Sequence, residues 1–414
     1  MLHESPLRNS HRQYADRLTA EKVSMSDAAS EQRPGAAHGS TVEAETTYLP
    51  FGPGDAGGDA YEVLGSLGTL EAEYAAFRRG AAILDSPHRG TVVLTGPERI
   101  DFLNRMITQE LASLEEGRAV ESFWLNRKGR IEADLLVVHT ENATLLLVDR
   151  HQAEVTTTSL SSFIIMEDAA IRDASDDWFH LAVHGPNALD VLAHASGDDE
   201  VHIAPLACGA INLAGVECTV VRRDLCGVPG IEILVPIADK ERVWNALVSA
   251  DETVGEGKRR VRPSGWFAFN IARIEAGAAL FNIDFGSSTL PHESGVFASR
   301  VSLTKGCYLG QEVVARMQSR GKAKQSLVRL DLTGEELPVA GAQVFAADDG
   351  AMATPVGVVT SSTLSPMLGA KAIAFAMVRA AHATEGDSLR VSADGTLCDA
   401  TVQPSLAAWT EAAT

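Results

Sequence analysis

The sequence changes character near residue 324, and this change constrains the fold more than any other feature. From there to the C-terminus, short apolar segments alternate with turns that contain glycine, proline or aspartate. The segments predicted to be strands are 327–332, 356–361, 372–378, 388–392 and 398–402. Short strands joined by frequent turns are typical of small barrels and sandwiches. Residues 323–409 are therefore predicted to form a separate all-β domain, with a small barrel as the favoured arrangement.

Upstream of this boundary, predicted helices and strands follow one another irregularly. Apolar residues recur every three or four positions over 67–83, which predicts an amphipathic helix. Strands are predicted at 130–139 and 144–149, with a turn between them. The sequence contains no Gly-x-Gly-x-x-Gly turn and no regular alternation of strand and helix. This pattern favours an α+β fold over a dinucleotide-binding sheet.

The first 44 residues mix arginines with acidic residues and contain no apolar block. They therefore lack the apolar core of a secretory signal, and their acids argue against an organelle transit peptide. Residues 1–44 are expected to form a disordered tail, because they cannot bury enough apolar surface to offset the entropy of ordering. The stretch before Met25, a second possible start, is expected to be dispensable.

Charge and cysteine content exclude several classes of protein. The formal net charge of −20 opposes general nucleic-acid binding. No apolar stretch approaches the roughly 20 residues that span a bilayer, so no membrane segment is expected. The five cysteines are sparse and odd in number, which argues against a secreted disulfide framework and favours a cytoplasmic location. None lies in a Cys-x-x-Cys pair, which argues against a self-contained zinc or cluster site. The cysteines are Cys208, Cys218, Cys226, Cys307 and Cys398.

Positive charge is concentrated in residues 300–329. This segment has seven basic residues and one acid, Glu312, in a strongly acidic chain. One interpretation is a solvated basic loop. The other is a local site that attracts a small anion or an acidic partner. The basic residues are Arg300, Lys305, Arg316, Arg320, Lys322, Lys324 and Arg329.

Several short motifs, in the same order along the chain, resemble the T-protein of the glycine cleavage system and its relatives. They lie at 79–86, 94–97, 125–134, 230–233, 273–277 and 357–361. The resemblance implies an α+β ring of three subdomains, with folate in a central channel and a C-terminal β-barrel. Residues 45–322 would then form a folate-binding, aminomethyltransferase-like region of two interleaved α+β subdomains.

The most specific motif is the run Lys305-Gly306-Cys307-Tyr308-Leu309-Gly310-Gln311-Glu312, with Arg316 following it. This run resembles the YgfZ-type branch of the family, which is similar to the Iba-type factors that assist maturation of iron–sulfur enzymes. Cys307 has Lys305 nearby, and positive charge raises the thiolate fraction of a thiol. Thiol chemistry, contact with a metal or cluster, and packing all remain open as roles for Cys307.

Three further residues are candidates for the folate site. Asp134 lies in a strand of alternating character, where it is either an acid bonded to backbone or a functional carboxylate. By resemblance, it is the T-protein aspartate that faces the reactive nitrogens of tetrahydrofolate and stabilises a developing positive charge. Glu232 is, by resemblance, the pterin-binding glutamate, since a carboxylate accepts two adjacent N–H groups; a surface acid is its alternative. Arg273 could hold the pterin or pair with Glu275 or another acid.

A metal interpretation of His180 and His184 is set aside. Four residues along a strand span roughly 13 Å, which is too far for one ion.

Two functional hypotheses follow from the resemblance. A third keeps the family fold but no folate function. The first is a tetrahydrofolate-binding factor that supports iron–sulfur enzymes, with client or assembly proteins as partners. The second is an aminomethyltransferase that passes a one-carbon unit to tetrahydrofolate from a lipoyl carrier protein or a small N-methyl amine; the presence of Asp134 favours it. The third is a scaffold that keeps the fold and binds no folate.

Overall fold

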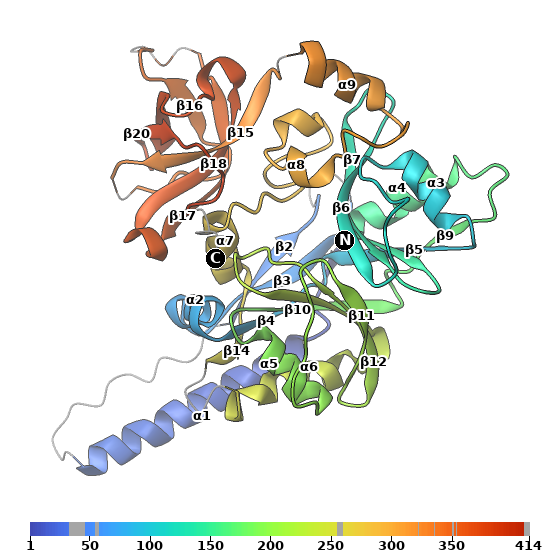
Figure 1. Ribbon diagram of the computed structural model, residues 1–414. Coiled ribbons are helices and arrows are strands. Elements are labelled where there is room, and N and C mark those ends of the chain that lie inside the picture. Colours follow the sequence, from blue (N-terminus) through green and yellow to red (C-terminus); the bar gives the residue numbers. More distant parts are fainter. Residues whose placement is uncertain are drawn as a thin grey trace.

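Four sheets and the helices around them make up the described part of the molecule. The computed structural model describes residues 1–32, 46–53, 58–254, 260–321, 323–334, 336–349, 352 and 354–409. In Figure 1 the C-terminal barrel, a five-stranded sheet and a six-stranded sheet surround the central helix α7 (Trp266–Glu275). This mixed α/β arrangement with a closed barrel confirms the predicted fold class.

The five-stranded sheet supplies the first wall of the candidate site. Its antiparallel strands have the order β6 (Arg118–Leu125), β7 (Ile131–His139), β8 (Thr144–Asp149), β5 (Arg89–Thr95) and β9 (Ala170–Asp173). Helices α3 (Arg99–Met106) and α4 (Arg150–Ser161) belong to this subdomain. Ala133 and Leu135 of β7 are buried in its core, so the alternating Asp134 points to the other face.

The six-stranded sheet supplies the opposite wall. Its order is β11 (Cys208–Leu213), β12 (Val216–Arg222), β13 (Gly230–Pro236), β10 (Trp178–His184), β4 (Ala81–Asp85) and β14 (Val261–Pro263). Helices α5 (Ala188–Ser196) and α6 (Lys240–Ser249) pack against it. Strand β4 precedes the five-stranded sheet in sequence and β10 follows it, so the two subdomains are interleaved.

The C-terminal region is a closed barrel, as predicted. Its strands are β15 (Gln325–Leu332), β18 (Lys371–Arg379), β17 (Gly357–Ser365), β16 (Gln343–Ala346), β19 (Ser388–Ala393) and β20 (Thr396–Val402). The sequence predicted five of these strands and missed β16. That strand has only four residues, which is too few for alternation to be recognised.

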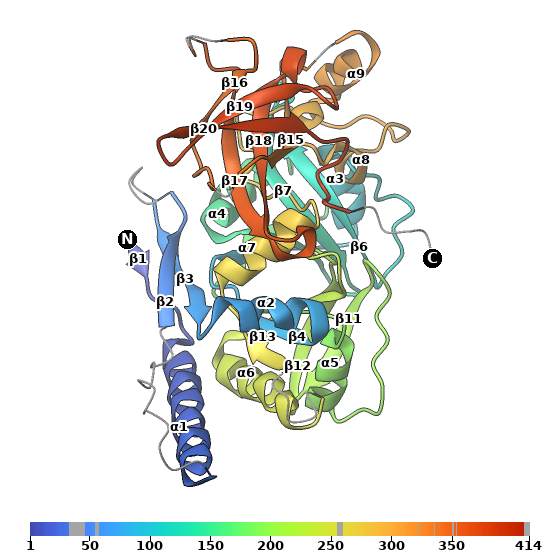
Figure 2. The ribbon, with the colours of Figure 1, turned by 90° about the vertical axis from the view of Figure 1, so that its left-hand side faces the viewer.

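Helices connect the barrel to the two sheets. In Figure 2, α7 and α2 (Leu70–Arg79) lie between the barrel and the six-stranded sheet. The helix predicted over 67–83 is shorter than expected, because β3 (Ala60–Leu67) and β4 take up its ends. Two further helices, α8 (Phe297–Arg300) and α9 (Gln311–Arg320), precede the barrel. None of the helices in the described residues is long and apolar enough to cross a membrane.

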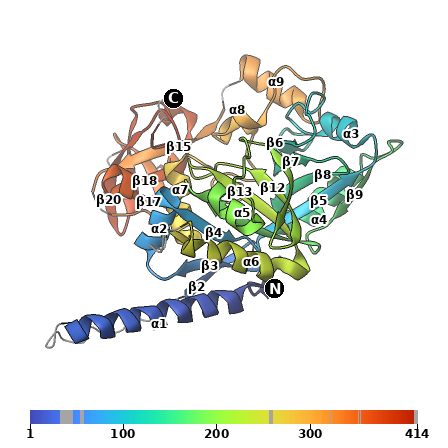
Figure 3. The same ribbon diagram turned by 60° about the horizontal axis from the view of Figure 1, so that its bottom comes forward.

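The expectation of a disordered tail over residues 1–44 is wrong for residues 1–32. They form β1 (Leu2–His3), which pairs with β3, and α1 (Arg8–Gln32), which runs beside β2 (Thr46–Phe51) and β3 in Figure 3. Residues 33–44 lie outside the described residues.

The error arose because this segment has one largely apolar face. Charged residues between the apolar ones make that face hard to recognise in the sequence. Leu7, His11, Tyr14 and Leu18 follow one another at steps of four, three and four, and all are buried against the six-stranded sheet and its helices. Such spacing places a few apolar groups on one side of a helix without any apolar run.

Truncating the buried leucine of this segment tests whether it belongs to the folded core. Leu7 is fully buried, so Leu7→Ala should lower the free energy of unfolding by about 2–5 kcal/mol in urea titrations. The exposed Gln13→Ala is the matched control and should change it by less than about 0.5 kcal/mol. Equal stabilities of the two variants would show that the segment does not contribute to the core.

Candidate functional site

A cavity lies between the five-stranded and six-stranded sheets, where β7 and β8 face β4, β10 and β13. Aromatic side chains line part of it, among them Phe51, Trp266 and Phe269. Asp134 and Glu232 also line it, so two of the three residues expected at a folate site meet in one place. Concave, largely apolar sites with a few convergent polar groups are typical of ligand-binding pockets.

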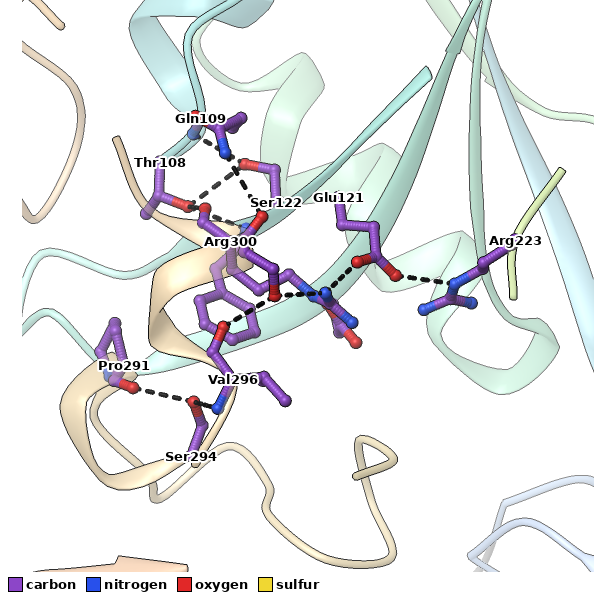
Figure 4. A network of polar contacts seen from close by, with 12 residues as sticks. Thr108, Gln109, Glu121, Ser122, Arg223, Pro291, Ser294, Val296 and Arg300 are labelled. Atoms are coloured by element: carbon purple, nitrogen blue, oxygen red, sulfur yellow. Dashed lines mark hydrogen bonds and ion pairs between the residues drawn. The ribbon is translucent and has the colours of Figure 1, made fainter. Parts of the chain in front are cut away.

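A chain of alternating charges joins the two acids. Nε of Arg300 donates a 2.9 Å hydrogen bond to Oδ1 of Asp134, and its Nη1 bonds to Glu121. Arg223 then donates from Nε to Oε1 of Glu121 at 2.8 Å and from Nη1 to Oε1 of Glu232 at 3.3 Å. Figure 4 shows Glu121 between Arg300 and Arg223. The chain Asp134–Arg300–Glu121–Arg223–Glu232 thus runs from one sheet to the other.

The position of Arg300 is fixed through its backbone. The hydroxyl of Thr108 donates a 2.6 Å hydrogen bond to the carbonyl oxygen of Arg300, as Figure 4 also shows. Thr108 is the second residue after α3, and Arg300 ends α8. This bond ties the short helix α8 to the five-stranded subdomain, so that the guanidinium can reach both Asp134 and Glu121.

The arginines keep Glu232 and Glu121 ionised. Burial alone would raise the pKa of Glu232, but attraction by Arg223 and Arg89 outweighs it and holds the pKa below its usual value. The same competition, with Arg223 and Arg300 as partners, lowers the pKa of Glu121. Buried charges of this kind are stable only as long as each keeps its partner.

Three neutral histidines add to the wall. His180 and His184 flank Ala182 on β10, which lies directly across from Glu232, and His88 lines the same cavity. Burial lowers the pKa of His180 to about 3 and that of His184 to about 4. Among the described residues, no group of three or more His, Cys, Asp or Glu side chains is arranged to hold a metal ion.

Close contact between β13 and His184 requires a glycine. A Cβ atom on Gly230 would lie 2.4 Å from Nδ1 of His184 and 2.4 Å from the carbonyl oxygen of Arg223. Glycine at this position therefore lets the imidazole lie against the strand that carries Glu232.

The structure does not bring Arg273 to the cavity. Its guanidinium is fully buried and donates to Oδ2 of Asp284 and to Oγ of Ser361, both at 2.6 Å. Ser361 belongs to β17, so its hydrogen bond with Arg273 fastens α7 to the barrel. The sequence left two roles open for Arg273, a contact with the pterin or a pair with an acid. Its contacts match the second role, with Asp284 as the acid.

The motif around Cys307 lies outside the residues that line the cavity. Cys307 itself is exposed. The ammonium group of Lys305 donates to the carbonyl oxygens of Asn104, Ile107 and Gln109 at 2.7, 2.8 and 2.7 Å. Burial lowers the pKa of Lys305 to about 8.

The rest of the motif begins helix α9. Tyr308 is buried, and Gly310 has a φ of 83°, which favours glycine. Gln311 starts α9, on which Glu312 and Arg316 are exposed. Most of the motif therefore shapes the loop between α8 and α9, and Lys305 ties this loop to the end of α3 and the residues after it.

The basic segment divides into buried and exposed residues, so neither simple interpretation describes all of it. Arg300, Lys305 and Arg329 are buried and bonded within the protein, whereas Arg316 and Lys324 are exposed. The side chain of Arg320 and residue 322 lie outside what the structure describes.

Sequence reasoning missed the residues that support the two acids. Glu121 and Arg223 carried no motif, and Arg300 was noticed only as part of a basic run. The available signal was an acid within a largely apolar strand, at Glu121 in β6, which would need a partner if buried.

The comparisons with known proteins agree with this architecture. The GCVT N-terminal domain matches residues 60–305, and the glycine cleavage T-protein C-terminal barrel domain matches residues 325–406. The chain belongs to the glycine cleavage T-protein family.

Its relatives in that family are named aminomethyltransferases. The protein from Thermotoga petrophila is 31% identical over 324 residues, which cover 78% of this chain and 85% of that protein. The protein from Streptomyces avermitilis is 30% identical, with 77% and 84% covered. The crystal structure of glycine cleavage system aminomethyltransferase T from Bartonella henselae has the same fold, with a TM-score of 0.75 and 22% identity over 88% of this chain and 95% of that one.

Because the histidines of the cavity are buried and neutral, we predict that the protein loses stability as the pH falls. The pKa of His184 is about 4 in the folded chain, against 6.5 for an unperturbed histidine. Between these values the unfolded chain binds a proton that the folded chain does not, so the free energy of unfolding falls as the pH falls through this window. His184→Gln should remove about 2 kcal/mol of the loss between pH 6.5 and 4.

Urea unfolding at several pH values measures this slope. His202→Gln is the control, because the side chain of His202 is 78% exposed, and the slope of this variant should match that of the unaltered protein. An unchanged slope in His184→Gln would contradict a neutral, buried His184.

Proposed function

We propose that this protein binds tetrahydrofolate in the cavity and transfers a one-carbon unit to it as an aminomethyltransferase. The observation that carries the proposal is the convergence of Asp134 and Glu232, from different sheets, on one cavity with aromatic walls. The names of the relatives support the same activity.

Glu232 is suited to bind the pterin ring. Arg223 bonds to its Oε1, and no described residue donates a hydrogen bond to Oε2. Attraction by Arg223 and Arg89 lowers the pKa of this buried carboxyl despite the effect of burial, so it is ionised at neutral pH. An ionised carboxylate accepts adjacent N–H groups of a pterin in a planar, charge-assisted pair. The rings of Trp266 and Phe269 offer apolar faces to the flat heterocycle.

Asp134 is suited to the chemical step. Its Oδ1 is held by Arg300, which leaves Oδ2 without a hydrogen bond from any described residue. A fixed carboxylate stabilises the positive charge that develops on nitrogen when a one-carbon unit is transferred as an iminium-like group. The donor in this proposal is an aminomethyl group on a lipoyl carrier protein. Its carbon is already at the oxidation level of methylene-tetrahydrofolate, and its transfer releases ammonia and the carrier thiol.

Titration calorimetry with tetrahydrofolate tests the binding half of the proposal. Glu232→Gln should weaken binding by about 10–100-fold, because it removes a charge-assisted pair. Asp134→Asn should retain most of the affinity and lose methylene-tetrahydrofolate formation in an assay with donor. Glu217→Gln, an exposed acid on the neighbouring strand β12, is the control for loss of a strand carboxylate. A protein that binds no tetrahydrofolate would refute the proposal.

We propose separately that Cys307 supports iron–sulfur enzymes, because its thiol is exposed. A solvent-accessible cysteine in a loop before α9 can meet another protein without any change of fold. In the host, Cys307→Ala should lower iron–sulfur enzyme activities and leave tetrahydrofolate affinity unchanged. Cys208→Ala, a half-buried cysteine, is the control. Unchanged enzyme activities in Cys307→Ala would exclude this role for the thiol.

A further inference from the structure

The N-terminal segment reaches the wall of the cavity through a serine. Ser5 lies between β1 and α1, and its Oγ donates a 2.8 Å hydrogen bond to Oδ2 of Asp85. Ser5 is 4% exposed and Asp85 5%. Asp85 ends strand β4 and lines the cavity. A segment that precedes the family match, which begins at residue 60, therefore contacts a residue of the proposed binding site.

Helix α1 approaches the same carboxylate through a histidine. Nε2 of His11 is 3.7 Å from Oδ2 of Asp85, and Nδ1 is 3.1 Å from Oη of Tyr48. Burial lowers the pKa of His11 against the opposing attraction of Asp85, and burial raises the pKa of Tyr48 to about 12. Both groups are therefore neutral near pH 7. When Tyr48 donates to Nδ1, the ring hydrogen lies on Nε2 and faces Asp85.

The other oxygen of Asp85 has no such support. Oδ1 is buried, and no described residue donates a hydrogen bond to it. A buried carboxylate oxygen without a donor costs free energy, so it is normally paired. Because Asp85 lines the cavity, a molecule bound there is placed to supply the missing donor.

We propose that Asp85 is a ligand-binding carboxylate of this cavity, and that Ser5 is a positioning residue that holds Oδ2 so that Oδ1 accepts an N–H group of the bound molecule. This inference rests on the proposed function, since it names a further contact of the same site. It also makes the N-terminal segment a part of the site, where the sequence suggested a dispensable tail.

Two molecules could bring the N–H group, and their chemistry is the same for Asp85. One is tetrahydrofolate, whose reduced pterin carries several N–H donors. The other is the amine donor of the one-carbon unit. Asp85 is a carboxylate, so either a neutral N–H or an ammonium group satisfies it.

A double-mutant cycle tests the proposal on the full-length chain. The variants are Ser5→Ala, Asp85→Asn and the two combined, each checked for an unchanged near-ultraviolet circular dichroism spectrum. Tetrahydrofolate affinity is measured by calorimetry, and kcat and KM by one-carbon transfer from an amine donor, an aminomethyl-lipoyl carrier protein. His3→Ala is the control. His3 lies on the same N-terminal segment as Ser5, but it contacts Asp59 and Tyr61 and does not touch Asp85.

Asp85→Asn should weaken tetrahydrofolate binding, or raise KM for the amine, by about tenfold. The first result assigns the contact to the pterin and the second to the amine; either one supports the proposal. Ser5→Ala should produce a smaller loss of the same kind, and it should add nothing in the Asp85→Asn background, because it acts through that carboxylate. A loss of stability alone would not make the effect of Ser5→Ala on binding or KM depend on the presence of Asp85. If Asp85→Asn does not fold, Ser5→Ala carries the test against His3→Ala.

The contrary outcomes are distinct. Unchanged affinity and KM in Asp85→Asn, with an active unaltered protein, overturn the role of Asp85 and leave the proposed function standing. A loss in Ser5→Ala that is equally large in the Asp85→Asn background overturns the positioning role. An unaltered protein that neither binds tetrahydrofolate nor uses the amine overturns the proposed function, and this inference with it.

Discussion

The alternating chain Asp134–Arg300–Glu121–Arg223–Glu232 is the interaction on which the cavity depends. It begins on β7, passes through α8 and β6, and ends on β13, so it crosses the gap between the two sheets. Removing Arg300 would leave Asp134 without its ion-pair partner, and removing Arg223 would do the same to Glu232, which is far costlier than losing an exposed ion pair. The spacing of the sheets and the orientation of the two acids are therefore set together.

A second buried ion pair explains how the barrel contributes without lining the cavity. Arg273 on α7 is bonded to Asp284 and to Ser361 of β17, and Glu275 of the same helix accepts a hydrogen bond from Ser365, also in β17. The first turn of α7 carries Trp266 and Phe269, which line the cavity, whereas Arg273 lies in its last turn. The barrel thus fixes the helix whose aromatic side chains complete the site, and Arg273 acts at a distance from any ligand.

The sequence predicted those features that depend on local pattern and missed those that depend on distant partners. Alternation along β7 and the turns after residue 324 were sufficient for the position of Asp134 and for the barrel. Arg300 lies 166 residues from Asp134, and no periodicity connects them. Helical spacing could place Arg273 on a face of α7 but could not say that this face meets the barrel. Leu7, Tyr14 and Leu18 had a helical spacing too, and the surrounding charges obscured it.

The acids of the cavity share an arrangement that limits what can bind. Asp134, Glu232 and Asp85 each have one oxygen held by the protein, through Arg300, Arg223 and Ser5 respectively, and no described residue donates a hydrogen bond to the other oxygen. The two arginines that line the cavity, Arg89 and Arg223, are already bonded to carboxylates. Such a wall attracts N–H groups and cations and repels anions. A folate would therefore place its N–H-rich pterin inside, and its anionic tail would lie toward solvent.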